Sequence, residues 1–348
     1  MFFNKRIVGM FVMLTSVCYG LEVYASDTTS SVDQPTEDKV DRMPKLHGVF
    51  RGRYEGAWPD YSQLFQVRNA RVSLEGKILE NLDYYLRVDF CDRGTIKFLD
   101  GWGRWKINSE FDVKVGRFRV PFGVDAFLGP GSYIFADRSF LGKQMANLRQ
   151  VGVQVGYHCK SYPLTLEAGV FNSSTSQTQW QKNLDYAAKA SYRVGNVTLS
   201  ASFLSMMPAG VRMNIVDGSV SWKYANLIVE GEYQRLHYCG NDRKDVNAWL
   251  AFASYGIPVN WRPFNLWSFH GRFDAMGDHS DGIPGDDGLL MVNDPARRRV
   301  TVGASIACNV KKVKAEIILD YEKYFFDKGV VAPIGQDNKI VAELVLKF

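Results

Sequence analysis

Apolar and polar residues alternate along most of the chain with a period of two, which is typical of β-strands. The alternation is clear at Leu82–Cys91 and Val313–Tyr321, and it continues through the last ten residues, where polar positions face away from an apolar row. Chain ends normally fray in polar sequence, so a half-apolar strand at this position must be held by neighbours. In a closed barrel the last strand pairs with the first, which predicts pairing with Leu46–Glu55. The apolar face of the terminal strand is Ile340, Ala342, Leu344, Leu346 and Phe348.

The same alternation divides the region 45–348 into about sixteen strands, each near the ten residues that a tilted strand needs to cross a bilayer. Short connections alternate with long ones, as expected for periplasmic turns and external loops. The predicted fold is therefore all-β: a transmembrane antiparallel β-barrel of sixteen strands. The connection Gly256–Asn265 is long on the short side, so a count higher or lower by two stays open. The expected long loops are Val120–Arg149, Ser173–Asn183, Gly277–Pro295 and Phe325–Asn338.

The first 25 residues predict a cleaved signal peptide, because two cations precede the apolar run Ile7–Val17 and small residues follow. The run is too short to span a bilayer as a helix. Acylation at Cys18 is an alternative, disfavoured by the bulky residue before it. Residues 26–44 are rich in Ser, Thr and Asp and predict a flexible periplasmic leader, followed by the barrel domain at 45–348. The predicted destination is the cell outer membrane.

Composition agrees with a membrane barrel and excludes several other classes. The aromatic content is 14% with 31 glycines, and both residue types recur within the strands. The net charge of +5 is small, and the only tight basic run, Arg297–Arg299, carries no nucleic-acid recognition motif. No phosphate-binding glycine loop or zinc spacing occurs, so no cofactor is expected. The cysteines expected in the mature chain lack any CxxC spacing, and free thiols are favoured over disulfides: Cys91, Cys159, Cys239 and Cys308.

One block of sequence carries a family resemblance. Val113–Gly123, with the sequence VKVGRFRVPFG, resembles the signature of the phosphate-selective porin O and P family of Gram-negative outer membranes. Phe135–Ser139, Arg149–Val155 and Arg68–Gly76 are similar to further pieces of the family pattern, in the same order. The resemblance implies a sixteen-stranded porin, commonly trimeric, whose third loop folds into the lumen. It also implies passive diffusion of small hydrophilic solutes and makes Phe348 an assembly signal for the outer-membrane insertion machinery.

The strand arginines are predicted to face the lumen, since a charge facing lipid at mid-membrane costs roughly 2–4 kcal/mol. In one interpretation they pair with Glu55, Glu75, Asp83 and Asp89 in a solvated wall. In the other they are unpaired and concentrate anions, phosphate among them. The paired wall is favoured because acidic partners lie on the same strands, and the near balance of charge argues against strong phosphate selectivity. These pore-wall candidates are Arg51, Arg53, Arg71, Arg87 and Arg104.

A second basic set belongs to the third loop and is the predicted pore constriction, because the resemblance brings that loop inward. The alternative is that Asp137 and its neighbour only tie the loop to the wall. The candidates for the constriction and solute binding are Arg117, Arg119, Arg138, Lys143 and Arg149.

Aromatic residues near strand ends predict the two girdles at the membrane interfaces, with a stacking track for solutes as the less favoured alternative. The acidic loop Gly277–Pro295 predicts a solvated external loop rather than a calcium site. A barrel enzyme using Ser268, His270 and Asn265 is disfavoured, since residues two apart on a strand lie about 7 Å from each other. A non-conducting barrel for adhesion or assembly shares every strand signal and stays open. The expected girdle residues are Tyr84, Trp102, Trp105, Trp222, Trp249, Tyr255, Trp261 and Trp267.

Overall fold

The computed structural model describes most of the region predicted to be the barrel. The described residues are 42–92, 94–145, 149–173, 180, 182–207, 210–240, 244–284, 290–310, 313–328, 330 and 332–348, without the side chains of 144 and 279–294. The predicted signal peptide and almost all of the predicted leader lie outside these residues.

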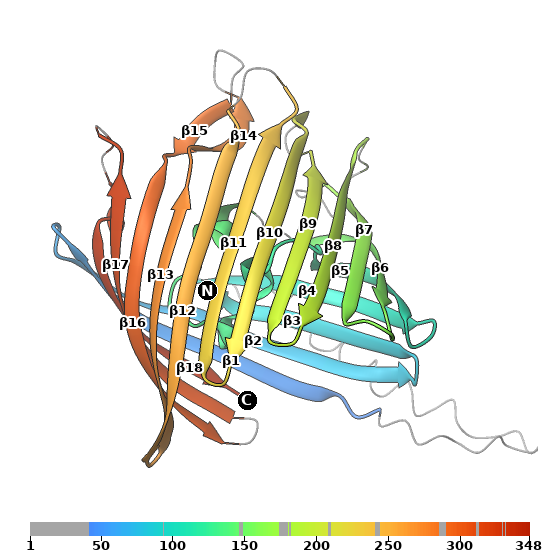
Figure 1. Cartoon of the computed structure of the whole chain (residues 1–348), viewed down its shortest axis with the longest axis horizontal. Helices are drawn as coiled ribbons and strands as arrows, with labels where there is room; N and C mark the ends of the chain where they lie inside the picture. Colours follow the sequence, from blue (N-terminus) through green and yellow to red (C-terminus); the bar gives the residue numbers. More distant parts are fainter. Residues whose placement is uncertain are drawn as a thin grey trace, which may run out of the picture. The chain divides into compact units, whose positions relative to one another are not determined.

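Sixteen antiparallel strands close into one barrel, as predicted from the alternation (Figure 1). Each strand pairs with its neighbours in sequence, except that β13 pairs with β16 across a separate two-stranded hairpin, β14–β15. The strands are β1 (Lys45–Trp58), β2 (Ser62–Leu79), β3 (Leu82–Asp92), β4 (Thr95–Lys106), β5 (Phe111–Arg119), β6 (Arg149–His158), β7 (Leu164–Asn172), β8 (Leu184–Val194), β9 (Val197–Met206), β10 (Met213–Tyr224), β11 (Leu227–Tyr238), β12 (Val246–Trp261), β13 (Phe264–Met276), β14 (His279–Pro284), β15 (Leu290–Asp294), β16 (Arg297–Val310), β17 (Val313–Phe326) and β18 (Asn338–Lys347).

The closing pair is β1 with β18, which confirms the predicted partner of the terminal strand. Along β18 the side chains alternate as expected: Val341, Glu343 and Val345 are buried in the lumen, whereas Leu344 and Leu346 are exposed on the outside. A ladder without an edge satisfies the backbone hydrogen bonds that lipid cannot. The barrel wall is therefore continuous at the seam between the two ends of the domain.

Two connections differ from their predicted form. The long connection expected at Gly256–Asn265 is absent, because β12 extends to Trp261 and β13 begins at Phe264. The acidic loop Gly277–Pro295 contains the β14–β15 hairpin, of whose side chains nothing is described. None of the helices among the described residues is long and apolar enough to span a membrane.

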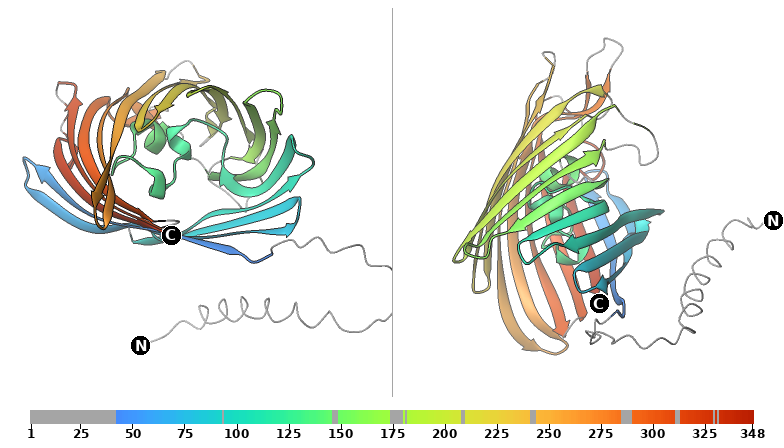
Figure 2. Two further views of the ribbon diagram at one scale, coloured as in Figure 1. Left: turned by 60° about the horizontal axis from the view of Figure 1, so that its bottom comes forward. Right: turned by 90° about the vertical axis from the view of Figure 1, so that its right-hand side faces the viewer.

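The third loop comprises residues 120–148 (hereafter L3), and its described part, 120–145, lies inside the ring of strands (Figure 2). Its described part contains two short 3-10 helices, η1 (Asp125–Phe127) and η2 (Pro130–Ser132), and a π-helical turn, η3 (Leu141–Met145). The apolar side chains of L3 pack against inward-facing apolar residues of β7–β13. The buried cluster includes Phe122, Phe135, Phe140, Leu141 and Met145 from L3, and Leu204, Ile215, Leu236, Ala248 and Leu250 from the wall.

Candidate functional site

L3 is attached to the seam of the barrel by arginines of β1. Arg51 and Arg53 each form an ion pair of 2.6 Å with Glu343 of β18, and both donate hydrogen bonds to the carbonyl oxygen of Ala136 in L3. Arg53 also pairs with the Asp137 carboxylate at 2.7 Å. These two predicted pore-wall arginines are thus buried, and they hold the loop.

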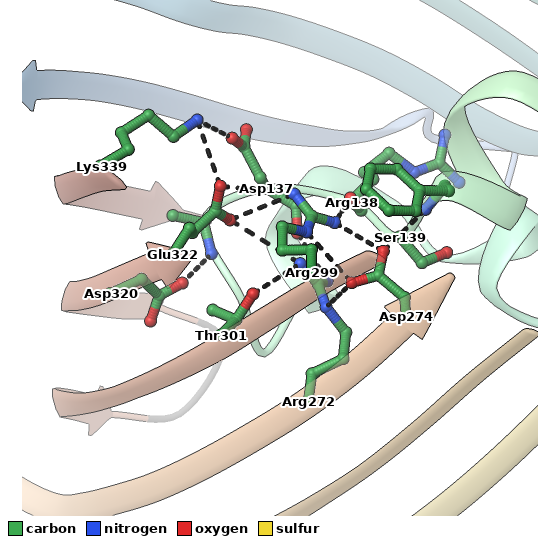
Figure 3. Close-up of polar contacts among 12 residues, drawn as sticks. Asp137, Arg138, Ser139, Arg272, Asp274, Arg299, Thr301, Asp320, Glu322 and Lys339 are labelled. Carbon is green, nitrogen blue, oxygen red and sulfur yellow. Dashed lines mark hydrogen bonds and ion pairs between the residues drawn. The ribbon is translucent and has the colours of Figure 1, made fainter. Parts of the chain in front are cut away.

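A second group of charges, from β13 and β16–β18, continues this attachment (Figure 3). The Arg299 guanidinium lies between Asp274, at 2.8 Å, and Glu322, at 3.2 Å, and donates to the carbonyl oxygen of Arg138 at 2.6 Å. Arg272 donates to the carbonyl oxygen of Asp137 at 2.8 Å. We call the anchor network the set Arg51, Arg53, Asp137, Arg272, Asp274, Arg299, Glu322, Lys339 and Glu343.

Asp137 is the L3 carboxylate at the centre of the anchor network. Lys339 of β18 lies 2.5 Å from its Oδ2 and also contacts Glu322 at 3.2 Å. Burial alone would raise the pKa of Asp137, but Lys339 and then Arg53 hold it well below its ordinary value. The carboxylate is therefore charged over the physiological range, and L3 is held by a charged contact.

The opposite end of L3 is held by backbone donors. Glu232 of β11 accepts hydrogen bonds from the amides of Val124, at 2.8 Å, and Asp125, at 2.9 Å. Lys189 of β8 donates to the carbonyl oxygen of Gly123. With the apolar cluster, these contacts fix L3 against β8–β13 and leave uncovered part of the side of the lumen that β2–β6 line.

A cavity of about 550 Å³ lies on that uncovered side, between L3 and the wall formed mainly by β1–β6. Six of its lining side chains are cationic at neutral pH and two are carboxylates, so its field attracts anions. We call it the lumen cavity. The cations are Arg71, Arg87, Lys114, Arg119, Arg149 and Lys347, and the carboxylates are Glu75 and Asp100.

The arginines of the lumen cavity have fewer acidic partners than those of the anchor network. Arg71 pairs with Asp89 at 2.7 Å, while Arg87 and Arg149 share Asp100 at 3.3 and 2.8 Å. Each of three guanidiniums keeps one buried nitrogen that has no hydrogen-bond partner among the described residues, namely Nη1 of Arg71, Nε of Arg119 and Nη2 of Arg149. Because these nitrogens are buried, a solute in the cavity would meet the charge of the guanidiniums rather than these donors.

Two aromatic residues of the wall face this cavity. Trp102 was expected in the outer girdle, but its ring lines the lumen cavity and stacks on Tyr85 of β3, with centroids 5.4 Å apart and planes inclined by 17°. Gly116 of β5 lies opposite Trp102, where a Cβ would come within 2.3 Å of the Gly101 carbonyl oxygen and 2.7 Å of the Trp102 Cα. Close backbone packing beneath the indole thus requires glycine at this position.

The predicted site residues divide into three groups. Arg71, Arg87, Arg119 and Arg149 line the lumen cavity; Arg51 and Arg53 belong to the anchor network. Arg119 also donates to the carbonyl oxygens of Ala126 and Leu128 in L3, at 2.5 and 2.8 Å. The remaining candidates lie outside the cavity lining: Arg104 pairs with Asp83 at 2.8 Å, Arg117 donates to the Leu99 carbonyl oxygen at 3.1 Å, Arg138 donates to the Asp125 carbonyl oxygen at 2.9 Å, and Lys143 is exposed on η3.

Predicted partners are present for part of the wall. Arg53 pairs with Glu55 at 2.9 Å, Arg71 with Asp89 and Arg104 with Asp83, whereas Glu75 contacts His47 at 3.1 Å. His270, considered for an enzyme triad, instead pairs with Asp320 at 2.7 Å and packs against the ring of Phe135. It supports L3.

Several residues important to this arrangement were missed from the sequence. The anchor residues Arg272, Asp274 and Glu322 lie on the inward faces of their strands. The alternation of the sequence could therefore have identified them as charged residues inside the lumen. The apolar half of the lumen also had a signal, because β12 is largely apolar on both faces from Val246 to Phe252. Trp102 shares a strand face with Arg104, which was correctly placed inward.

Cysteines and metal sites add nothing to the lumen chemistry. Cys91, Cys159, Cys239 and Cys308 are all free cysteines. Within the described part of the chain, no group of three or more His, Cys, Asp or Glu side chains could hold a metal ion.

A closed sixteen-stranded barrel with a charged loop inside its lumen defines the class of outer-membrane porins. Three solved structures share the fold. They are the anion-selective porin from Comamonas acidovorans (13% identity, TM-score 0.59, 88% of this chain and 98% of that chain), the outer-membrane channel DcaP of Acinetobacter baumannii (12%, 0.59, 88% and 97%) and OprB of Pseudomonas putida (12%, 0.61, 88% and 94%). Among curated proteins nothing matches the chain.

The sequence model of the family described as phosphate-selective porin O and P matches residues 48–227, just over half of the chain. The chain therefore belongs to that family, as the resemblance of its third-loop block predicted. It is an outer-membrane porin, a channel for small solutes.

Proposed function

We propose that this porin prefers small anions, and that they pass between L3 and the wall formed by β2–β6. The observation that carries the proposal is the charge of the lumen cavity, whose lining includes six cationic side chains and only two carboxylates. The arginines of this lining have few acidic partners, since Arg87 and Arg149 share Asp100, so their field would draw anions into the cavity. The family description makes phosphate the first anion to compare with chloride.

The test is the reversal potential across a salt gradient for protein reconstituted in a planar bilayer. The informative variant is Arg71→Gln combined with Arg149→Gln. Asp89 keeps hydrogen bonds from Asn69 and the Ala70 amide, and Asp100 keeps Arg87, so neither carboxylate is left alone. A unit charge about 8 Å away in water changes an ion's energy by roughly 0.5 kcal/mol. Removing a positive charge disfavours the anion and favours the cation by that amount, so each substitution should lower the anion-to-cation permeability ratio about fivefold at low salt.

A charge-matched control is Lys160→Gln, on the exposed turn between β6 and β7, which should leave the permeability ratio unchanged. A wild-type protein without any anion preference, or a preference that survives loss of both arginines, contradicts the proposal. A protein that forms no conductance steps at all would instead support a non-conducting barrel.

We propose that the protein is a homotrimer, exported by a signal peptide at residues 1–25, with outer-membrane lipid and the barrel-assembly machinery as partners and no enzymatic activity. OmpT of Vibrio cholerae, whose fold is similar, has been solved in a trimer form. Phe348 is the proposed assembly signal. Its backbone exchanges hydrogen bonds of 3.0 and 3.1 Å with Gly48, at the seam.

A further inference from the structure

The lumen cavity carries aromatic rings as well as cations. Tyr85 and Trp102 form the stacked pair on the wall, and Phe118 and Phe127 also line the cavity. Phe127, on η1 of L3, is 37% exposed although it lies inside the barrel. A ring left open to the lumen is available to a solute, since a large apolar side chain gains nothing from facing water.

Cations lie over several of these rings. The Arg87 guanidinium is 4.8 Å from the Tyr85 ring centroid, and the Lys114 amine lies 5.7 Å from the Trp102 ring and 4.4 Å from the Phe118 ring. Such distances are those of cation–π contacts, which hold each cation beside an aromatic surface. Positive charge and flat apolar surface are therefore presented together at the same wall.

The size of the cavity distinguishes classes of anion. Its volume of about 550 Å³ falls within the range of roughly 300–1,000 Å³ that is typical of sites for small organic molecules. An inorganic anion would use the guanidiniums and leave the rings in contact with water. A solute with both a carboxylate and a planar ring would use both: the carboxylate on Arg87 or Arg149, and the ring against Trp102 or Tyr85.

We propose that the lumen cavity is a binding subsite for small organic anions that carry a planar aromatic ring, with monocyclic aromatic carboxylates as the class. The proposal rests on the anion preference proposed above and makes it more specific. Trp102 and Tyr85 recognise the ring, while the cations recognise the carboxylate. Such a solute would be held in the channel longer than an inorganic anion.

The test measures block of the chloride current through the wild-type protein by added benzoate. Cyclohexanecarboxylate, which has the same charge and a similar size but a saturated ring, and acetate, which has no ring, are the matched probes. We expect saturable block by benzoate at a concentration at least fivefold lower than for either probe. Equal block by benzoate and cyclohexanecarboxylate overturns the requirement for an aromatic ring.

The variant Trp102→Leu should raise the half-blocking benzoate concentration at least fivefold relative to the wild type. Trp105→Leu is the matched control: Trp105 is three positions along the same strand, 52% exposed on the outer face, and should not alter the block. Tyr85→Leu provides a second variant if Trp102→Leu fails to assemble. An unchanged benzoate block in the assembled variant overturns the assignment.

The two proposals fail in different ways. Loss of the anion preference would appear in the reversal potential without any organic anion present. An anion-selective wild-type channel that benzoate blocks no better than acetate would refute the aromatic subsite alone. Glucose 6-phosphate gives a further arm, because block by this sugar phosphate as strong as by benzoate would show that a saturated sugar ring satisfies the site, and so would contradict the aromatic class.

Discussion

The anchor network and the wall of the lumen cavity use the same kind of residue in opposite ways. In the anchor network Arg299 has two carboxylate partners, and its side chain is 3% exposed. In the lumen cavity Arg87 and Arg149 share one carboxylate, and the Arg87 side chain is 29% exposed. Neutralised arginines hold the loop, whereas partly neutralised ones supply a field. The number of arginines on a lumen wall therefore says little about selectivity until their partners are known.

The largest effect should come from breaking the anchor network at Arg299. In Arg299→Ala the buried carboxylates of Asp274 and Glu322 each lose one counter-charge and keep Arg272 and Lys339, respectively, as their nearest cations. Removing one partner of a buried ion pair costs about 3–5 kcal/mol. We expect a free energy of unfolding lower by that amount, measured by denaturant titration of the folded barrel in detergent, together with noisy single-channel currents as L3 loosens.

The neighbouring residue gives the control for this loss. Arg298 is exposed and pairs with Asp327 at 3.2 Å, also exposed, and such surface pairs contribute about 0–1 kcal/mol. Arg298→Ala should therefore be nearly neutral. Equal destabilisation by the two substitutions would remove the distinction between anchored and exposed arginines.

A smaller effect is expected from the loop side of the same contact. In Asp137→Asn, Arg53 keeps Glu343 and Lys339 keeps Glu322, so we expect a loss of about 1–3 kcal/mol. Burial opposes ionisation of Asp137, but Lys339 and Arg53 lower its pKa well below the ordinary value. A lowered pKa stabilises the folded state above the ordinary value near pH 4, and this contribution is lost as the pH falls further.

The pH dependence is the measurement that isolates Asp137. Between pH 7 and pH 5 the unfolding free energy of the wild type should hold the full contribution of this carboxylate, and between about pH 4 and pH 2 it should decline more steeply than that of Asp137→Asn. Asp60→Asn, which removes the same charge from the exposed turn between β1 and β2, should follow the wild-type curve. Parallel curves for wild type and Asp137→Asn would contradict the role given to this residue.

The smallest effect needs no substitution: it compares how the lumen cavity and the anchor network respond to ionic strength. Raising potassium chloride from 0.1 M to 1 M shortens the Debye length from about 10 Å to about 3 Å. We expect the anion-to-cation permeability ratio to fall toward that of bulk solution, because the cavity arginines are reached by solvent. The unfolding free energy should change by less than about 1 kcal/mol, because the anchor pairs are buried. A selectivity that is insensitive to salt would show that it arises from contact rather than from the field.

The sequence was sufficient to predict the strands of the barrel wall, but not the side-chain contacts inside the lumen. Period-two alternation placed the strands, the closing pair and the inward direction of Arg53, Arg71 and Arg104, because a strand side chain has only two faces to choose from. It could not supply the partners of Arg51, since Glu343 lies 292 positions away and the closure of the barrel brings the two together.

The position of L3 was predictable only through the family resemblance. A loop has no period, so the docking of Asp137 and Phe135 on a particular stretch of wall cannot be read from their own neighbourhood. The misplacement of Trp102 was avoidable, because Arg104 two residues later had already been assigned to the lumen. The apolar lining of β12 was visible as well, but it was counted as ordinary strand composition.

The anchor network also depends on closure of the barrel. Two of its arginines lie on β1, and their shared carboxylate, Glu343, lies on β18 with the lysine that holds Asp137. These groups face one another only after the first and last strands have paired. A barrel still open at that seam would lack much of the holding surface for its third loop. The contacts of the loop with the seam can therefore form only after closure, whereas its contacts with Glu232 and the apolar cluster do not require it.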